Sequence, residues 1–324
     1  PHQRNVSKNT IASYRDSFVQ FINYMKDING IPVERLLLKH LTRDNVINYL
    51  QWLHNTKKNT SATCNYRLAA IRSFCSYLQY IVIDNMVEWQ SILSIKAKKT
   101  EISPPNYLSM EGIKLLLAQP DTTSWKGRRH LALLSLMYDT GARVQEIADL
   151  TVDCVRIDTT PYTIRLTGKG RKTRIVPLAE AQVDILRSYM EENNLNDPNM
   201  MKKPLFFNGR HEKLTREGIT YILKIYADMA NKQQPEIIPK KISCHSIRHS
   251  KAMHLLQAGV NLVYIRDILG HVSIQTTDIY ARADSKAKRE ALENAYTRLT
   301  PNTITEKEWE RNKNLLEWLK GLGH

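Results

Sequence analysis

Hydrophobic residues in the first hundred positions recur at steps of three and four, which is the spacing of one face of a helix. A first helix is expected to begin at Ser7 and a second at Thr42, because both residue types cap helix N-termini. A third helix is expected from Ser61 to about Tyr80, and a shorter one over residues 85–92. Four helices in so short a stretch predict a helical bundle.

After this bundle the pattern changes to helices that are interrupted once by short strands. A helix is expected from Ser124 to Asp139, with Gly141 ending it. Helical spacing returns at Ala179 and dominates from there on. The fold class is therefore mainly α with a small antiparallel β-sheet. Three short segments rich in Val, Ile and Thr predict the strands of that sheet: residues 155–157, 163–166 and 173–177.

Residues 96–107 separate the two regions and show little periodicity. They contain three lysines and a Pro-Pro pair, which is typical of an interdomain linker. The sequence therefore predicts a helical domain over residues 1–95 and a mixed α/β domain over residues 108–300. Residues 301–324 form a tail whose helical pattern has a broad apolar face, suited to packing on its own domain or on another subunit.

Charge narrows the choice of partner. The 324 residues include 47 Lys and Arg against 32 Asp and Glu, a formal net charge of +15. Residues 1–100 alone carry +8, with the basic residues interleaved among apolar positions. This excess predicts a polyanionic partner, usually nucleic acid, with an inert basic surface as the alternative.

Other protein classes are disfavoured. No apolar run approaches the roughly 18–20 residues that cross a membrane. The four scattered cysteines form no pair typical of a zinc ribbon or a disulfide scaffold. The sequence therefore predicts a cytoplasmic protein with reduced thiols, and the expected partner places it with the prokaryotic nucleoid.

Two motifs in the second region suit phosphate binding. Gly141 ends one helix, and Arg143 lies two residues later at the start of the next helix. A guanidinium at that position, together with the helix N–H groups, can hold a phosphate. Lys169 lies between glycines in a hairpin turn over residues 168–172. The alternatives are an arginine in a surface cap and a solvated hairpin tip.

Three further motifs follow toward the C-terminal end. His245 and Arg248 are spaced to share one helix face and could point at one anionic group. His271 comes directly after a glycine that ends an apolar helix, and Tyr280 falls nine residues later. Taken alone, each motif has an ordinary explanation. The His245–Arg248 spacing is common by chance, a glycine followed by His271 is a common helix end, and Tyr280 could be a packed aromatic residue.

In this order and spacing the motifs resemble the tyrosine recombinase (phage integrase) family over nearly the whole chain. The resemblance implies a helical core-binding domain followed by a catalytic domain. It also implies a site-specific recombinase that cuts and rejoins DNA through a 3′-phosphotyrosyl link. The resemblance identifies as catalytic Arg143, Lys169, His245, Arg248, His271 and the nucleophile Tyr280, with Glu146 supporting the first arginine.

The residue types fit that chemistry. A phenol with a pKa of about 10 is a poor nucleophile at neutral pH, so it needs activation. Two arginines can neutralise the phosphate oxygens and stabilise the charge of the transition state. Lys169 suits a general acid for the leaving oxygen, His245 could move a proton at the tyrosine and His271 could donate to the phosphate. No carboxylate cluster indicates a metal, so cleavage without metal or other cofactor is expected.

The expected partner is double-stranded DNA. The resemblance also implies a homo-oligomer, a dimer on one site and a tetramer in the synapse, with contacts made by the tail. Arg67 is the weakest candidate for a DNA contact, because it falls near the inward stripe of its helix. The candidate DNA contacts are Lys57, Lys58, Arg67, Arg72, Lys96, Lys98, Lys99, Arg171, Lys172 and Arg174.

Two other functions remain open from the sequence. A type IB topoisomerase resembles this family in its nucleophile and arginines, and a non-catalytic DNA-binding accessory protein could share the fold. Within the recombinase reading, the tail and the long loop over residues 191–203 favour a mobile element over chromosome-dimer resolution.

Overall fold

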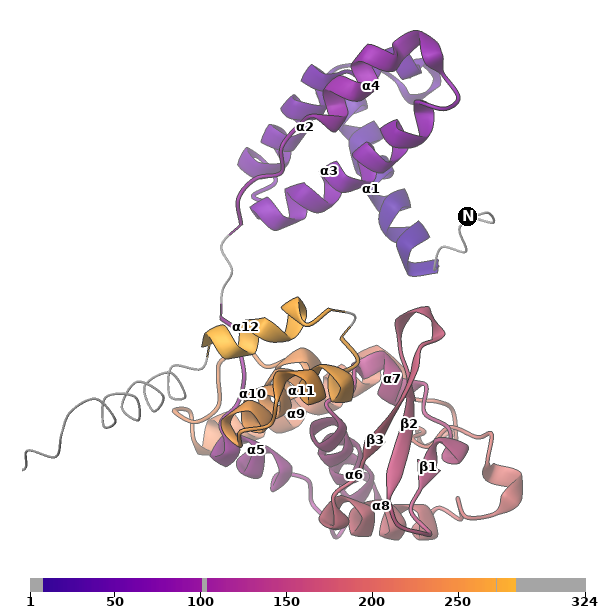
Figure 1. Cartoon of the computed structure of the whole chain (residues 1–324), viewed down its shortest axis with the longest axis vertical. Coiled ribbons are helices and arrows are strands. Elements are labelled where there is room, and N and C mark those ends of the chain that lie inside the picture. Colours follow the sequence, from indigo (N-terminus) through magenta and orange to yellow (C-terminus); the bar gives the residue numbers. More distant parts are fainter. Residues whose placement is uncertain (1–7, 101–103, 272, 284–324) are drawn as a thin grey trace, which may run out of the picture. The chain divides into compact units, whose positions relative to one another are not determined.

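A computed structural model of the chain describes residues 8–100, 104–271 and 273–283 (Figure 1). The chain divides into two units, Pro1–Ser103 and Pro104–His324, and each is described by itself. The predicted start of the first helix at Ser7 lies outside the described residues, and so does the tail predicted over residues 301–324. Among the described residues no helix is long and apolar enough to cross a lipid bilayer.

The first unit is the predicted helical bundle, and α3 contacts each of its other three helices. Tyr49 and Trp89 are fully buried in its core, where the Tyr49 ring meets Phe21 edge-on at 5.2 Å between centroids. Short 3-10 turns over Val33–Arg35, Leu38–His40 and Ile83–Asn85 connect the helices. The helices are α1 (Lys8–Asp27), α2 (Arg43–Asn55), α3 (Ser61–Leu78) and α4 (Met86–Leu93).

Helix caps in this unit follow the sequence, with one correction. Thr42 caps α2 as predicted, because its side chain accepts a hydrogen bond from the Asn45 N–H. Ser61, the predicted cap of α3, is instead its first helical residue. Thr60 takes the cap position because its backbone is extended and its hydroxyl accepts from the Thr63 N–H.

The two ends of the predicted linker are each tied to their own unit. Asn65 on α3 holds the backbone of Lys98, accepting from its N–H at 2.9 Å and donating to its carbonyl at 2.8 Å. The side chain of Asn106 donates to the carbonyl of Lys241, and the Leu108 N–H donates to Ser250 at 2.8 Å.

The second unit is helical around a small sheet, as predicted. In its core α6 packs against α8 and α10, while α11 contacts α10, α12 and β3. Short 3-10 turns cover Val152–Cys154, Lys169–Arg171 and Pro198–Met200. The helices are α5 (Met110–Leu117), α6 (Trp125–Thr140), α7 (Val144–Ala148), α8 (Glu180–Glu192), α9 (Arg216–Gln233), α10 (Cys244–Gln257), α11 (Leu262–Leu269) and α12 (Gln275–Ala283).

The sheet is antiparallel in the order β1 (Val155–Arg156), β2 (Thr163–Thr167) and β3 (Thr173–Pro177), and Figure 1 shows β2 and β3 as a long hairpin. Leu166 of β2 pairs with Arg174 of β3. Arg174 lies two residues before Val176, which is buried in the same strand. Because side chains alternate between the two faces of a strand, Arg174 shares the inward face of β3.

Candidate functional site

Gly141 determines where Arg143 lies. It ends α6 in the left-handed region at φ +56°, and a Cβ there would lie 2.7 Å from the Leu269 side chain. Only glycine fits this close approach to α11. The chain turns at once, so Arg143 occupies the N-cap of α7 and its guanidinium donates to the Gly270 carbonyl at 3.2 Å.

Glu146 connects two arginines beneath this site. Its carboxylate, with a side chain only 2% exposed, accepts from Arg143 Nη1 at 2.8 Å and from Arg174 Nη2 at 2.7 Å. Burial raises the pKa of Glu146, but the hydrogen bonds and charges of the two arginines outweigh it and lower the pKa to about 2. The carboxylate is therefore ionised at neutral pH and holds both guanidiniums in place.

Arg174 differs from the sequence expectation. The sequence predicts it as a DNA contact at the hairpin tip, together with Arg171 and Lys172, but its side chain is only 11% exposed. Besides Glu146 it binds the Ile268 carbonyl through Nε at 2.7 Å. Side chains alternate between the two faces of β3, and Arg174 lies on the inward face. It therefore holds Glu146 through an ion pair and is not part of the exposed tip.

Arg248 is the second arginine that the motif predicted, and it is buried at 2% exposure. Its Nη1 donates to the Gly141 carbonyl and its Nη2 to the Leu269 carbonyl, both at 2.7 Å. Burial, followed by repulsion from Arg143, lowers its pKa to about 10, so the guanidinium stays protonated at neutral pH.

Tyr280 lies on α12 in a small core with α10 and α11, and it is 1% exposed. Burial raises the pKa of its phenol, while the charges of Arg248 and Arg143 act in the opposite direction. Its Oη lies 2.8 Å from Nδ1 of His249. None of the sequence motifs includes His249, although it lies one turn after His245 on the same helix face, a spacing that indicates a shared site.

The two predicted histidines occupy different surroundings. His271 stacks on the Tyr280 ring at 6.4 Å and 13°, and its Nδ1 bonds the buried Thr277 hydroxyl at 2.9 Å. Burial and the charge of Arg248 lower its pKa to about 4. His245 is exposed and meets His249 edge-on at 5.1 Å. It is His249, therefore, that bonds the tyrosine hydroxyl.

The hairpin brings its turn close to this cluster. Lys169 lies in the turn between β2 and β3, and its side chain falls outside the described part of the structure. Gly168 packs so tightly that a Cβ there would lie 2.9 Å from Glu146 Oε1. Arg171 and Lys172 are exposed, as expected for the tip. Among the described residues, no group of three or more His, Cys, Asp or Glu side chains is placed to hold a metal ion.

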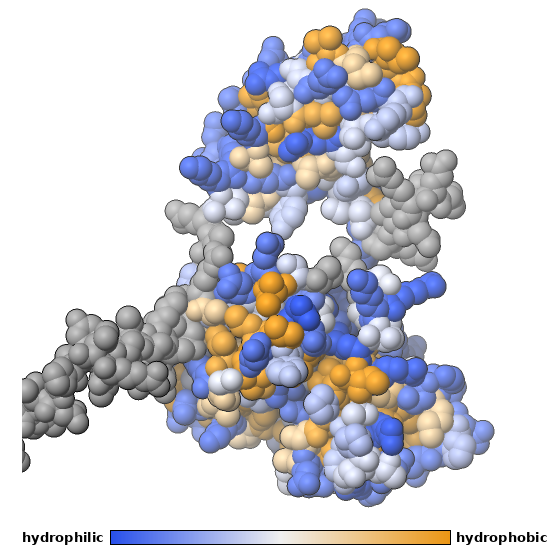
Figure 2. Space-filling view, in the orientation of Figure 1, coloured by the Kyte–Doolittle hydropathy of each residue, from blue (hydrophilic) through white to orange (hydrophobic). Residues whose placement is uncertain are grey.

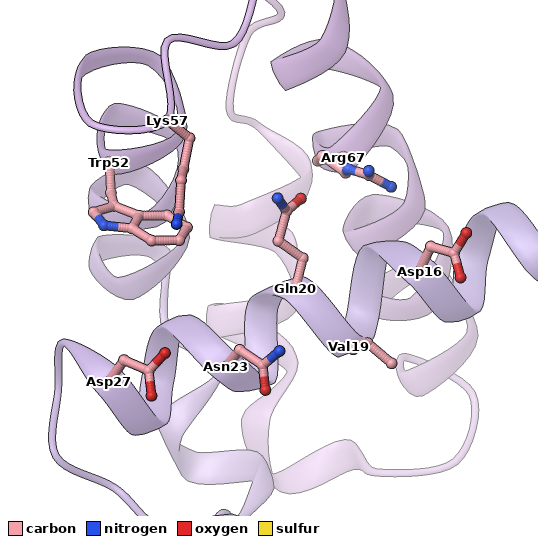
Figure 3. Close-up of a pocket in the computed structure, with 8 residues that line it drawn as sticks. All are labelled: Asp16, Val19, Gln20, Asn23, Asp27, Trp52, Lys57 and Arg67. Atoms are coloured by element: carbon pink, nitrogen blue, oxygen red, sulfur yellow. The ribbon is translucent and has the colours of Figure 1, made fainter.

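The candidate DNA contacts of the first unit occupy varied positions, and Figure 2 shows hydrophilic residues interspersed with hydrophobic ones on its visible face. Lys57 is exposed and lies over the Trp52 ring at 5.0 Å. Arg67 is half-buried and donates to Ser17 at 2.9 Å. Both face a pocket of about 420 Å³ that α1 lines with Gln20 and other polar residues (Figure 3). Arg72 is half-buried, and the remaining candidates, Lys58, Lys96, Lys98 and Lys99, are exposed.

Comparison with known proteins agrees with this arrangement. Residues 106–287 match the phage integrase family, and residues 1–80 match the N-terminal SAM-like domain of phage integrases. The Sinorhizobium fredii protein y4rC is 32% identical over 99% of this chain and 94% of its own length. Tyrosine recombinase XerD of Listeria monocytogenes is 31% identical over 86% of this chain and 89% of its own.

Solved structures share the fold. The XerH site-specific recombinase bound to a palindromic difH substrate aligns with a TM-score of 0.68 and 24% identity, covering 89% of this chain and 80% of that one. The Tn1549 transposon integrase in complex with transposon right end DNA aligns with a TM-score of 0.67 and 18% identity, covering 90% of this chain and 95% of that one. The family match spans the residues that form the cluster around Tyr280. The chain belongs to the phage integrase family of tyrosine recombinases.

Proposed function

We propose that this protein is a site-specific DNA recombinase that cuts and rejoins DNA strands through a covalent 3′-phosphotyrosyl intermediate on Tyr280. The single observation that carries the proposal is the placement of Tyr280 beside His249 and His271, with Arg248 and Arg143 near enough for their charges to oppose the rise in its phenol pKa that burial causes. A phenol held between cations and imidazoles is suited to attack a phosphodiester.

The arginines are anchored and still have donors to offer. A guanidinium has five N–H donors. Arg248 directs one bond to each of two carbonyls, and Arg143 directs one to Glu146 and one to Gly270. The remaining donors can bind the two non-bridging oxygens of a phosphate. Because the anchors fix both groups before DNA arrives, little reorganisation is needed in the transition state.

The other proposed roles follow from position. Lys169, carried on the hairpin turn, protonates the 5′ oxygen as it leaves, and His271 donates to a phosphate oxygen. His245 is exposed at the start of α10, where it can also donate to bound phosphate. Because Tyr280 is 1% exposed, DNA binding must uncover its Oη before that atom reaches phosphorus.

We also propose the partners and the biological role. The exposed cations Lys57, Lys58, Lys96, Lys98 and Lys99 contact DNA phosphates, and the tail over residues 301–324 joins subunits into a dimer on one site and a tetramer in the synapse. The reaction serves integration, excision or transposition of a mobile element in the cytoplasm. The fold shared with the Tn1549 transposon integrase supports this role. Recovered binding sites that flank an element would agree with it, whereas one chromosomal site would contradict it.

The test is covalent capture on DNA. A bound sequence is first selected from a random duplex pool and then nicked beside the scissile phosphate, so that the cleaved fragment diffuses away. Wild type should form a denaturant-resistant adduct with the 3′ end, and Tyr280→Phe should form none. Tyr264→Phe, a change at an exposed tyrosine on α11, is the matched control and should react normally. Absence of adduct with wild type would contradict the proposal, and relaxation of plasmids without the site would indicate a topoisomerase.

A further inference from the structure

The hydroxyl of Tyr280 has a partner that the recombinase motif does not assign. His249 directs Nδ1 at Tyr280 Oη across 2.8 Å, and the two ring centroids lie 5.6 Å apart. His249 follows Arg248 on α10, whereas Tyr280 is on α12, so two separate helices create the contact. A hydrogen bond of this length is within the range for direct proton transfer.

We propose that His249 is a further catalytic residue, which accepts the phenolic proton of Tyr280 during attack on DNA. The inference rests on the proposed recombinase function. His245 is the other histidine on this face of the helix, but it is exposed, and its ring meets that of His249 edge-on. Geometry therefore favours His249 as the group at the nucleophile.

The protonation state of His249 agrees with this role. Burial, together with the neighbouring His245 and Arg248, lowers its pKa to about 4. The imidazole is thus neutral at pH 7 and has one nitrogen free to accept a proton. Because the phenol pKa is raised and the imidazole pKa is lowered, transfer in the resting protein is uphill. It becomes favourable only as Oη bonds phosphorus, which makes the phenolic proton strongly acidic.

The step balances. The Oη–H bond breaks while the Oη–P bond forms, and His249 Nδ1 takes the proton. The P–O5′ bond breaks, and the leaving oxygen takes a proton from Lys169. In rejoining, the 5′ hydroxyl attacks phosphorus and returns its proton to Lys169. The Oη–P bond then breaks, and His249 returns its proton to Oη.

The experiment compares single-turnover cleavage by full-length His249→Asn, His249→Ala and Lys169→Ala on two suicide substrates. One substrate has the ordinary phosphodiester, and the other has sulfur at the 5′ bridging position, which leaves without protonation. Both His249 variants should cleave about 100-fold more slowly than wild type on both substrates. Lys169→Ala should be slow only on the ordinary substrate, because sulfur removes the need for an acid.

Several outcomes would overturn the inference while wild type still forms its adduct. These are a normal or faster rate for His249→Asn, or recovery of either His249 variant on the sulfur substrate. Normal cleavage by His249→Asn beside a slow His249→Ala would reduce His249 to a positioning residue. His254→Asn, on the same helix and bonded to Tyr138 at 2.9 Å, is the control and should cleave normally. All rates are measured where circular dichroism shows each variant folded, and an inactive wild type would instead contradict the proposed function.

Discussion

At the scale of single residues, the site depends on one buried carboxylate. Glu146 offsets the charges of Arg143 and Arg174, and Arg248 lies near enough to be affected by Arg143 and Glu146. Removing one member of a buried charge network leaves the others uncompensated, which costs more than the pair contributes. The geometry of the phosphate site and the stability of the fold therefore depend on the same side chain.

Glu146→Gln should lower the free energy of unfolding at pH 7 by about 3 kcal/mol and slow DNA cleavage by at least roughly tenfold. Denaturant melts and suicide-substrate rates measure the two effects. Glu192→Gln is the matched control, because Glu192 pairs with the more exposed Arg128 and should cost at most about 1 kcal/mol. If Glu146→Gln and Glu192→Gln lowered the unfolding free energy and the cleavage rate equally, Glu146 would not be the residue on which the buried charge network depends.

Acid should remove the same stabilisation. The pKa of Glu146 falls from 4.5 to about 2 on folding, so its contribution is complete above about pH 4.5. It is lost as the pH falls toward 2, because the protonated carboxyl no longer holds the arginines. The difference in unfolding free energy between wild type and Glu146→Gln should therefore shrink between pH 4.5 and pH 2. A difference that stays constant over this range would show that ionisation of Glu146 is not the cause.

Two arginines of the hairpin, Arg171 and Arg174, should separate stability from binding. Arg174→Ala removes bonds to Glu146 and to the Ile268 carbonyl, so it should lower both the melting temperature and the cleavage rate. Arg171→Ala removes an exposed cation, so it should leave the melting temperature unchanged and weaken DNA binding modestly. Thermal melts and gel-shift titrations make the comparison, and interchanged results would contradict the inward placement of Arg174.

At the scale of elements, local patterns predicted most of the fold and part of the site. Strand β3 was predicted at its observed bounds, and the αL glycine after α6 follows from sequence alone. Alternation along β3 also indicated the inward side of Arg174, although the cluster of nearby cations favoured a DNA contact at the hairpin tip. The contact between His249 and Tyr280 joins residues 31 positions apart, so only tertiary packing of α10 with α12 determines it.

The packing of the β2–β3 hairpin against Glu146 can be tested by adding one methyl group at Gly168. Gly168→Ala places Cβ 2.9 Å from Glu146 Oε1, so either the hairpin or the carboxylate must move. Cleavage should fall by roughly tenfold or more, because both Lys169 and Arg143 depend on this packing. Gly209→Ala, in a loop with nothing within 4 Å of the added Cβ, is the control and should have little effect on cleavage.

At the scale of the whole molecule, each unit has its own hydrophobic core, and the charge is unevenly shared. The first unit buries Tyr49 and Trp89, and the second buries a larger set around the sheet. Residues 1–100 carry more than half of the net charge of +15 in less than a third of the 324 residues. Two separately folded units joined by a basic segment can contact DNA over a wider surface than either alone.

This charge distribution leads to a measurable salt dependence. Each phosphate that the protein neutralises contributes about −0.9 to the slope of log affinity against log salt. Lys96, Lys98 and Lys99 are exposed beside the Asn65 anchor, so their combined change to alanine should make the slope shallower by about 2 to 3. A control triple, Lys114→Ala, Lys224→Ala and Lys232→Ala, removes the same charge from α5 and α9. Fluorescence anisotropy from 50 to 300 mM salt gives both slopes. Equal slopes in the two triples would mean that net charge, rather than contact by the linker lysines, governs binding.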